Sequence, residues 1–212
     1  MQKKNTFYAM LARMKYIKRW ALMRNAEEEN ISEHSLEVAI LSHALAFIGN
    51  TRLSKDLNAD RIAMLGVYHD CTEIITGDMP TPIKYENPTI QDAYKQIEKT
   101  AAFRLLNMLP DDLRTSYESY FTESSLDAYE KLIVKAADKL SAYIKCIEEE
   151  KAGNAEFKSA KQTIAKAITE LHCEEADIFV KEFLPAYELT FVLSFDSLDE
   201  YQEKIDKSEA KR

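Results

Sequence analysis

The adjacent pair His69-Asp70 is the most informative chemical feature of this sequence, because it lies in a segment that is otherwise apolar. An imidazole and a carboxylate are costly to bury unless they are paired or coordinate a metal ion. Neighbouring helical residues point about 100° apart, so both side chains reach one ion only if it lies between them. Two interpretations remain open: a buried ion pair, or half of a metal site completed by other segments.

The remaining ligands of such a site would come from distant parts of the chain. His34 lies near the start of an upstream predicted helix, and Asp138 lies beside the apolar stripe of a downstream one. Two imidazoles and two carboxylates suit Mn, Co, Fe or Zn better than Ca. The other two of the four histidines, His43 and His172, have no partner at a useful spacing, so we expect neither to be a ligand.

Helices must position these residues. The 212 residues include only 4 Gly and 5 Pro, and the composition favours helix over strand. Apolar periodicity and capping residues predict helices over 6–17, 33–48, 59–75, 89–108, 111–120, 126–151, 156–170 and 174–190.

One long loop interrupts this pattern. Pro80 and Pro82 each lack a backbone donor, so 76–88 is predicted not to be regular helix. A loop of this length inside a helical domain is more often functional than idle. No strand-like alternation occurs, so we predict an all-α fold with one domain over 1–212, in which 194–212 is a frayed polar tail.

Composition and charge limit the classes of partner. The net charge of −8 argues against a polymeric nucleic acid, although 1–26 carries basic residues and no acid. That basic segment either meets an anionic ligand or forms a solvated helix face. The three cysteines lack a CxxC pair, which favours a reducing compartment, and no segment resembles a signal peptide or membrane span. We expect a cytoplasmic protein with no membrane partner.

The four candidate ligands occur in the order that HD-domain metal phosphohydrolases use. Over residues 6 to about 190, the sequence closely resembles the bacterial 5′-deoxynucleotidases of the YfbR type. The segments that carry the resemblance are IKRWALMRN (17–25), SEHS (32–35), YHDCTEIITGDMPTPIKY (68–85) and KAADKLSAYIKC (135–146).

This resemblance implies a single HD-domain helical bundle, typically a homodimer. It implies hydrolysis of deoxyribonucleoside 5′-monophosphates to deoxynucleoside and phosphate, with discrimination against ribonucleotides. A divalent ion acidifies a water and polarises a phosphoryl oxygen, so no covalent intermediate is needed. The cofactor implied is one divalent metal, cobalt or manganese in preference to zinc or iron, held by His34, His69, Asp70 and Asp138.

The resemblance also implies two further catalytic residues beside Asp70. Glu73 matches the catalytic acid/base, and on a continuous helix it would share a face with Asp70. The alternative role for Glu73 is to orient His69. Arg19 matches the phosphate-orienting arginine, since a guanidinium can hold phosphate through two parallel hydrogen bonds.

The sugar is expected to lie between Trp20 and the 78–81 segment. An indole packed where a 2′-hydroxyl would lie leaves that hydroxyl desolvated, although a single tryptophan can equally fill a core. Asp78 could accept a hydrogen bond from the 3′-hydroxyl, and Met79 replaces the Leu common in the family. The substrate-binding residues implied are Arg19, Trp20, His34, Asp70, Asp78, Met79, Pro80, Thr81 and Asp138.

Two other functions compete with this one. An HD phosphodiesterase acting on a cyclic or dinucleotide signal often carries further histidines for a second metal, and the spare histidines here lie at unsuitable positions. A non-enzymatic helical module would use His69-Asp70 only as a buried ion pair. Cys71, beside a predicted ligand, suggests the separate hypothesis that oxidation inhibits the enzyme.

Overall fold

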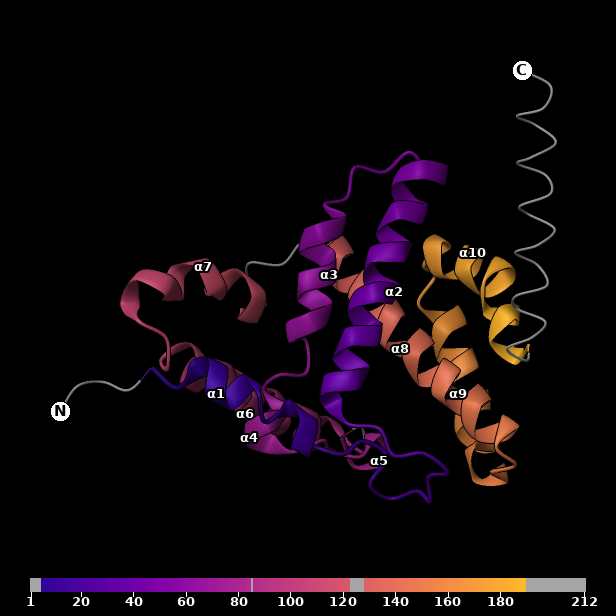
Figure 1. Cartoon of the computed structure of the whole chain (residues 1–212), viewed down its shortest axis with the longest axis horizontal. Helices are drawn as coiled ribbons and strands as arrows, with labels where there is room; N and C mark the ends of the chain where they lie inside the picture. The colour runs from indigo at the N-terminus through magenta and orange to yellow at the C-terminus, as the bar shows by residue number, and fades with distance from the viewer. Residues whose placement is uncertain (1–4, 85, 123–127, 190–212) are drawn as a thin grey trace, which may run out of the picture.

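The chain folds into helices that pack around two long central ones, α2 and α8 (Figure 1). The computed structural model describes every residue except 1–4, 85, 123–127 and 190–212. Among the described residues the only extended pairing is an isolated antiparallel bridge between Lys18 and Asn30, which confirms the all-α prediction. The helices are α1 (Phe7–Leu11), η1 (Met14–Tyr16), α2 (Ile31–Arg52), α3 (Ala59–Tyr68), α4 (Glu73–Thr76), α5 (Thr81–Lys84), α6 (Pro88–Leu106), α7 (Asp111–Phe121), α8 (Ala128–Lys151), η3 (Ala155–Phe157), α9 (Lys158–Glu170), α10 (Glu174–Glu182) and η4 (Leu184–Glu188).

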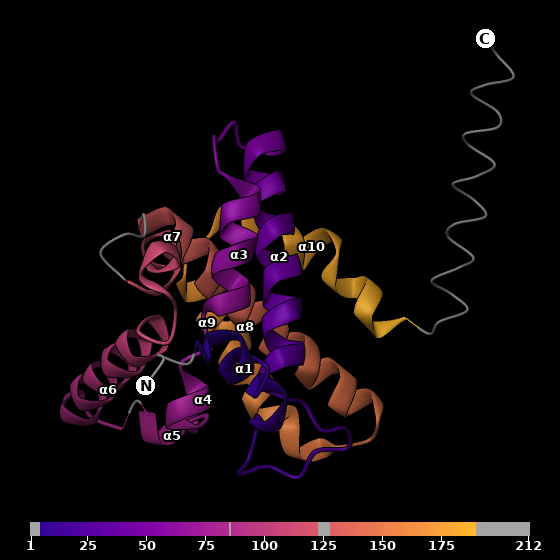
Figure 2. The ribbon, with the colours of Figure 1, turned by 60° about the vertical axis from the view of Figure 1, so that its left-hand side comes forward.

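The main core lies where α2, α3 and α8 meet. Leu45, Ile62 and Leu140 are fully buried there, and Figure 2 shows α2 and α3 lying side by side. The two helices approach closely because Gly66 has no side chain: a Cβ at that position would lie 2.8 Å from the Cα of Ala39. This close packing brings the end of α3 against the first turns of α2.

A second apolar cluster supports the segment that follows α3. Phe7, Ile31, Cys71, Leu105 and Leu109 are all buried in it. It joins α1, the start of α2 and the end of α6 beneath the 71–75 segment. The turn after α3 therefore rests on packed side chains from several elements.

The predicted helix over 33–48 begins earlier and ends later than expected. Asn30 is the N-cap: its Oδ1 accepts hydrogen bonds from the amides of Ser32 and Glu33, and the Glu33 carboxylate accepts one from the Asn30 amide. The helix also continues through Gly49 instead of stopping there. A Cβ at Gly49 would lie 2.8 Å from Oε1 of the buried Glu175, so this glycine allows close packing rather than ending the helix.

The prediction of one helix over 59–75 is wrong. Helix α3 ends at Tyr68, the chain turns at His69, and the short α4 begins at Glu73. The His69 ring nitrogen Nδ1 lies 2.7 Å from the carbonyl oxygen of Gly66. If the helix continued, this oxygen would accept a hydrogen bond from the Asp70 amide instead. His69 and Asp70 therefore occupy a turn, not the middle of a helix.

The other differences are local. The segment 6–17 divides into α1 and η1. The segment 174–190 divides at Phe183, two residues before Pro185, which cannot donate to a continuing helix. The 76–88 loop contains the four-residue α5. The expected tail at 194–212 lies outside the described residues, and the single domain over 1–212 stays a prediction. None of the helices described combines the length and the apolar character needed to span a bilayer.

Candidate active site

Three of the four predicted metal ligands form one group. The ligand atoms of His34, His69 and Asp70 all lie within 4.8 Å of one another. His34 comes from the first turn of α2 and is fully buried, whereas the other two come from the turn after α3. Asp138 of α8 lies beside this group, with its Oδ1 3.3 Å from His34 Nε2. Three separate segments of the chain therefore meet at one point.

The two imidazoles present bare nitrogens to this point. His69 Nδ1 must carry a hydrogen because its partner, the Gly66 carbonyl oxygen, only accepts. Nε2 of His34 and Nε2 of His69 are both buried and have no hydrogen-bond partner. Asp70 Oδ2 lies 3.5 Å from His34 Nε2 and 3.2 Å from His69 Nε2. Bare imidazole nitrogens beside a carboxylate fit a divalent metal ion.

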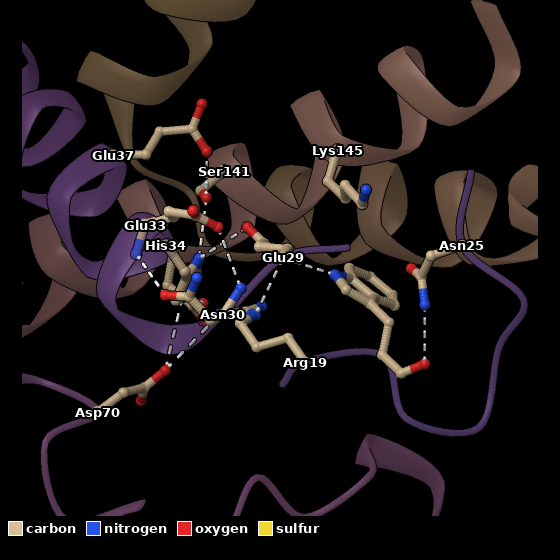
Figure 3. Close-up of polar contacts among 12 residues, drawn as sticks. Arg19, Asn25, Glu29, Asn30, Glu33, His34, Glu37, Asp70, Ser141 and Lys145 are labelled. Carbon is tan, nitrogen blue, oxygen red and sulfur yellow. Dashed lines mark hydrogen bonds and ion pairs between the residues drawn. The ribbon is translucent and has the colours of Figure 1, made fainter. Parts of the chain in front are cut away.

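Two residues that the sequence analysis missed orient His34. Its Nδ1 lies 3.0 Å from Ser141 Oγ, and that hydroxyl donates a hydrogen bond to Glu37 at 2.5 Å. Because the Ser141 hydroxyl is already a donor, it accepts from His34, which leaves Nε2 free to bind (Figure 3). Ser141 belongs to the KAADKLSAYIKC segment, so the resemblance contained a signal for it.

The charges of the site favour metal binding. Burial and the nearby Arg19 lower the pKa of His34, so its ring is neutral near pH 7. Burial disfavours ionisation of Asp70, but the His69 and His34 rings outweigh it and hold the Asp70 pKa well below its usual range. The pKa of Asp138 is also lowered: burial opposes ionisation, but the adjacent His34 ring and the charge of Lys139 outweigh it. At His69, burial lowers the pKa of the ring, but the Asp70 carboxylate outweighs burial and raises it. The site thus holds ionised carboxylates and a neutral His34, and a bound cation would displace the proton from His69 Nε2.

Glu73 has the opposite electrostatic character. Its side chain is 6% exposed, and its Oε2 has no hydrogen-bond partner. Burial and the charge of Asp70 raise the pKa of Glu73 to about 9, so the carboxyl is protonated near pH 7. A protonated buried carboxyl can act as a general acid. The alternative role, orienting His69 through Nδ1, is not supported because Gly66 occupies that nitrogen.

Arg19 lies next to the ligand group, and Trp20 follows it in the chain. The Arg19 side chain is 13% exposed and extends Nη1 to 3.7 Å from Asp70 Oδ2. Trp20 is half-buried, has a left-handed φ of 60°, and packs against Phe157 with ring centroids 5.2 Å apart. Both residues line a cavity of about 280 Å³, so Trp20 is not simply a core residue.

The 78–81 segment follows α4 through a left-handed Gly77, with φ of 75°. Asp78 is partly buried, which raises its pKa, and the charges of Arg19 and Asp70 act on it. Asp78 therefore lies within electrostatic range of the ligand group. Met79 and Pro80 are half-buried, and the Thr81 side chain lies outside the described part of the structure.

The comparisons with known proteins agree with this geometry. A family model described as 5′-deoxynucleotidase YfbR-like matches residues 6–187. The chain belongs to this family. A 5′-deoxynucleotidase of Vibrio cholerae is 50% identical over 184 residues, which cover 87% of this chain and 95% of that protein. One from Yersinia pestis (strain Pestoides F) is 49% identical over 194 residues, which cover 91% and 98%.

Solved structures share the fold of this YfbR-like chain. An HD-domain phosphohydrolase from Listeria innocua superposes with a TM-score of 0.76 at 19% identity, covering 96% of this chain and 98% of that one. The cyanophage S-2L HD phosphohydrolase DatZ, solved with dA and one catalytic Zn²⁺, gives a TM-score of 0.61 at 16% identity, covering 86% and 96%. The chain therefore has the HD-domain fold.

Three residues with reactive side chains lie outside the site of this YfbR-like chain. His43 makes an edge-to-face contact with Phe47 and lies 3.5 Å from Asp60, away from the ligand group. His172 occupies a turn with φ of 50° before α10. Cys71 is fully buried, and burial raises the pKa of its thiol strongly. A buried thiol held in its neutral form reacts slowly with oxidants, which argues against the redox hypothesis.

Proposed function

We propose that this chain hydrolyses deoxyribonucleoside 5′-monophosphates in a metal-dependent reaction, giving a deoxynucleoside and phosphate. The observation that carries this proposal is the bare Nε2 pair of His34 and His69 beside Asp70, next to the buried guanidinium of Arg19. The names of the family and of relatives about half identical to this chain support the substrate class.

In this proposal the metal would be held by two imidazoles and two carboxylates. When bound, a divalent ion supplies Lewis acidity and lowers the pKa of a water molecule. Asp70 and Asp138 are ionised, so each can accept a hydrogen bond from that water and aim its oxygen at phosphorus. The residues proposed as ligands are His34, His69, Asp70 and Asp138.

Arg19 and Glu73 act on opposite ends of the bond that breaks. The Arg19 guanidinium binds the phosphate and stabilises the charge that develops on its oxygens. As the water oxygen bonds to phosphorus, the bond from phosphorus to the 5′ oxygen breaks. The protonated Glu73 gives its proton to that leaving oxygen, which departs as the 5′-hydroxyl of the deoxynucleoside.

Discrimination against ribonucleotides is the finer part of the proposal. Trp20 would pack against the deoxyribose and leave a 2′-hydroxyl without a partner. Asp78 would accept a hydrogen bond from the 3′-hydroxyl, and Met79, Pro80 and Thr81 would complete the sugar-binding segment. The position of Trp20 beside Arg19, on the wall of a shared cavity, supports this arrangement.

The decisive experiment is a screen of the common nucleoside 5′-monophosphates, ribo and deoxy, against Co²⁺, Mn²⁺, Zn²⁺, Fe²⁺ and Mg²⁺. We expect phosphate release from the deoxy compounds, fastest with Co²⁺ or Mn²⁺, and abolition by a chelator. Hydrolysis of cyclic nucleotides or dinucleotides instead would support the phosphodiesterase interpretation. Absence of turnover with every metal, together with no metal in the purified protein, would support the non-enzymatic module.

We further propose a cytoplasmic homodimer. Leu36, Ile40 and Phe47 recur on one face of α2 and are 62%, 61% and 51% exposed, an apolar stripe that a second copy could cover. The three cysteines are free thiols, which agrees with a reducing compartment. Light scattering should give twice the chain mass, and Ile40→Glu should halve it. A monomeric wild-type protein would refute the dimer.

A further inference from the structure

We propose that Glu29 is a positioning residue that determines sugar specificity, because it holds Arg19 and Trp20 in one fixed arrangement. The inference rests on the proposed function, in which these two residues bind phosphate and deoxyribose. The inference adds that Arg19 and Trp20 recognise the phosphate and the sugar together, and that the Glu29 carboxylate sets their relative positions.

One oxygen of Glu29 contacts both neighbours. Oε2 accepts a hydrogen bond from Trp20 Nε1 at 2.8 Å and forms an ion pair with Arg19 Nε at 3.3 Å. The main chain adds a third link, since the Glu29 carbonyl oxygen accepts from the Arg19 amide at 3.0 Å. The Glu29 side chain is only 13% exposed, so water competes weakly for these contacts.

The contact to Nε has a consequence for phosphate binding. A guanidinium that pairs with a carboxylate on its Nε side keeps its two terminal nitrogens available as a fork for an anion. Arg19 Nη1 already lies 3.7 Å from Asp70 Oδ2, so the fork lies beside the ligand group. Glu29 therefore determines where the fork lies relative to the metal site.

The indole needs the same support. Trp20 adopts a left-handed φ of 60°, a conformation that a bulky residue rarely occupies. Its carbonyl oxygen accepts from Asn25 Nδ2 at 3.4 Å, while its ring is held by Glu29. A side chain on a strained backbone keeps one orientation only when other contacts determine it. Within the described residues, Glu29 accepts the hydrogen bond that the indole donates.

Glu29 also lies close to the predicted metal ligand His34 on α2. Its other oxygen, Oε1, lies 3.8 Å from His34 Nδ1, and Figure 3 shows its carboxylate between His34 and Arg19. A site that distinguishes the sugar and places the phosphate next to a metal needs Trp20, Arg19 and His34 at fixed positions relative to one another. The Glu29 carboxylate lies where all three meet.

The loop that carries Glu29 is anchored on α8. The buried Glu149 accepts hydrogen bonds from the amides of Ala26, at 2.7 Å, and Glu27, at 3.3 Å. Lys145 donates to Glu149 and to the Glu27 carbonyl oxygen, each at 2.5 Å. Three hydrogen bonds thus hold the backbone just before Glu29, so its carboxylate has a rigid base.

The test compares Glu29→Gln with Glu28→Gln. Glu28 is the matched control because it is adjacent, its side chain is 71% exposed, and its ion pair with Lys18 is also exposed. Losing a hydrogen-bonded charge should raise KM for a deoxynucleotide about tenfold in Glu29→Gln. The ratio of deoxy to ribo kcat/KM should fall, whereas Glu28→Gln should match the wild type.

Fluorescence gives a readout that does not depend on activity. Trp20 is the only tryptophan of the chain, so its emission reports directly on the indole. In the ligand-free protein, Glu29→Gln should shift this emission to longer wavelength and raise quenching by acrylamide. Unfolding midpoints of each variant will show whether the protein stays folded, and Glu29→Asp, which retains the charge, should recover part of the effect.

Two outcomes would overturn the inference. The first is a Glu29→Gln variant whose KM, ratio of deoxy to ribo kcat/KM and Trp20 fluorescence emission all match those of the wild type. The second is a variant that loses only metal affinity and kcat, with the sugar ratio unchanged, because Glu29 would then act through His34 alone. A wild-type protein that hydrolyses no deoxynucleotide would refute the proposed function, and the fluorescence comparison would still test the contact between Glu29 and Trp20.

Discussion

Replacing Glu73 by Gln should abolish activity and make the metal-free protein more stable. The folded state raises the pKa of this carboxyl from 4.5 to about 9, because burial and the Asp70 charge disfavour ionisation. In the unfolded chain the carboxyl ionises at its ordinary pKa. Folding at pH 7 therefore requires Glu73 to take up a proton, and this requirement reduces the free energy of unfolding.

The magnitude follows from the pKa difference. Each pH unit between the two pKa values costs about 1.4 kcal/mol, so the cost is about 3 kcal/mol at pH 7. The cost is absent below the unfolded pKa of 4.5, grows as pH rises, and levels off above about 9. Glu73 is 6% exposed, so solvent screening reduces this figure little. Gln has nearly the same shape and no ionisable group, so it removes the pH dependence.

The assay is urea unfolding of chelator-treated protein between pH 5 and 9. We expect Glu73→Gln and wild type to be similar at pH 5 and to diverge steadily toward pH 9, with the variant more stable. Turnover by the metal-loaded variant should fall by about 100-fold or more, as expected for loss of a general acid. Parallel stability curves for the two proteins, or a variant that is less stable at pH 8, would refute the protonated carboxyl.

The remaining predictions concern the ligands, the sugar and the fold. Asp138→Ala should abolish turnover with unchanged helical circular dichroism; retained activity would remove this residue from the ligand set. Trp20→Ala should lower the ratio of the hydrolysis rates of deoxyribonucleotides and ribonucleotides, and an unchanged ratio would mean that other residues recognise the sugar. Ser141→Ala should weaken metal binding, measured by calorimetry, about tenfold or more while Ser141→Thr retains it; equal affinities would mean that His34 needs no partner at Nδ1. Gly66→Ala should destabilise the protein by about 1–3 kcal/mol through the contact with Ala39, and a neutral result in urea unfolding would contradict the close packing.

Helices set by local signals were predictable from the sequence. The predicted 111–120 and 89–108 correspond to Asp111–Phe121 and Pro88–Leu106, because apolar periodicity and proline positions are local properties. The end of α3 at Tyr68 was not predictable in this way. Every residue from 59 to 75 is compatible with helix, and the break depends on a side-chain contact of His69 that periodicity does not encode.

In the candidate site too, some properties followed from the sequence and others only from the tertiary structure. The sequence by itself determined the chemical types: two imidazoles and two carboxylates for a metal, a guanidinium for phosphate, and a family pattern that assigns them. Only the tertiary structure decided the protonation of Glu73, the bare nitrogens of the histidines and the central position of Glu29. Residue types are local, whereas burial and hydrogen-bond partners depend on which distant segments pack together, and these set pKa values and orientation.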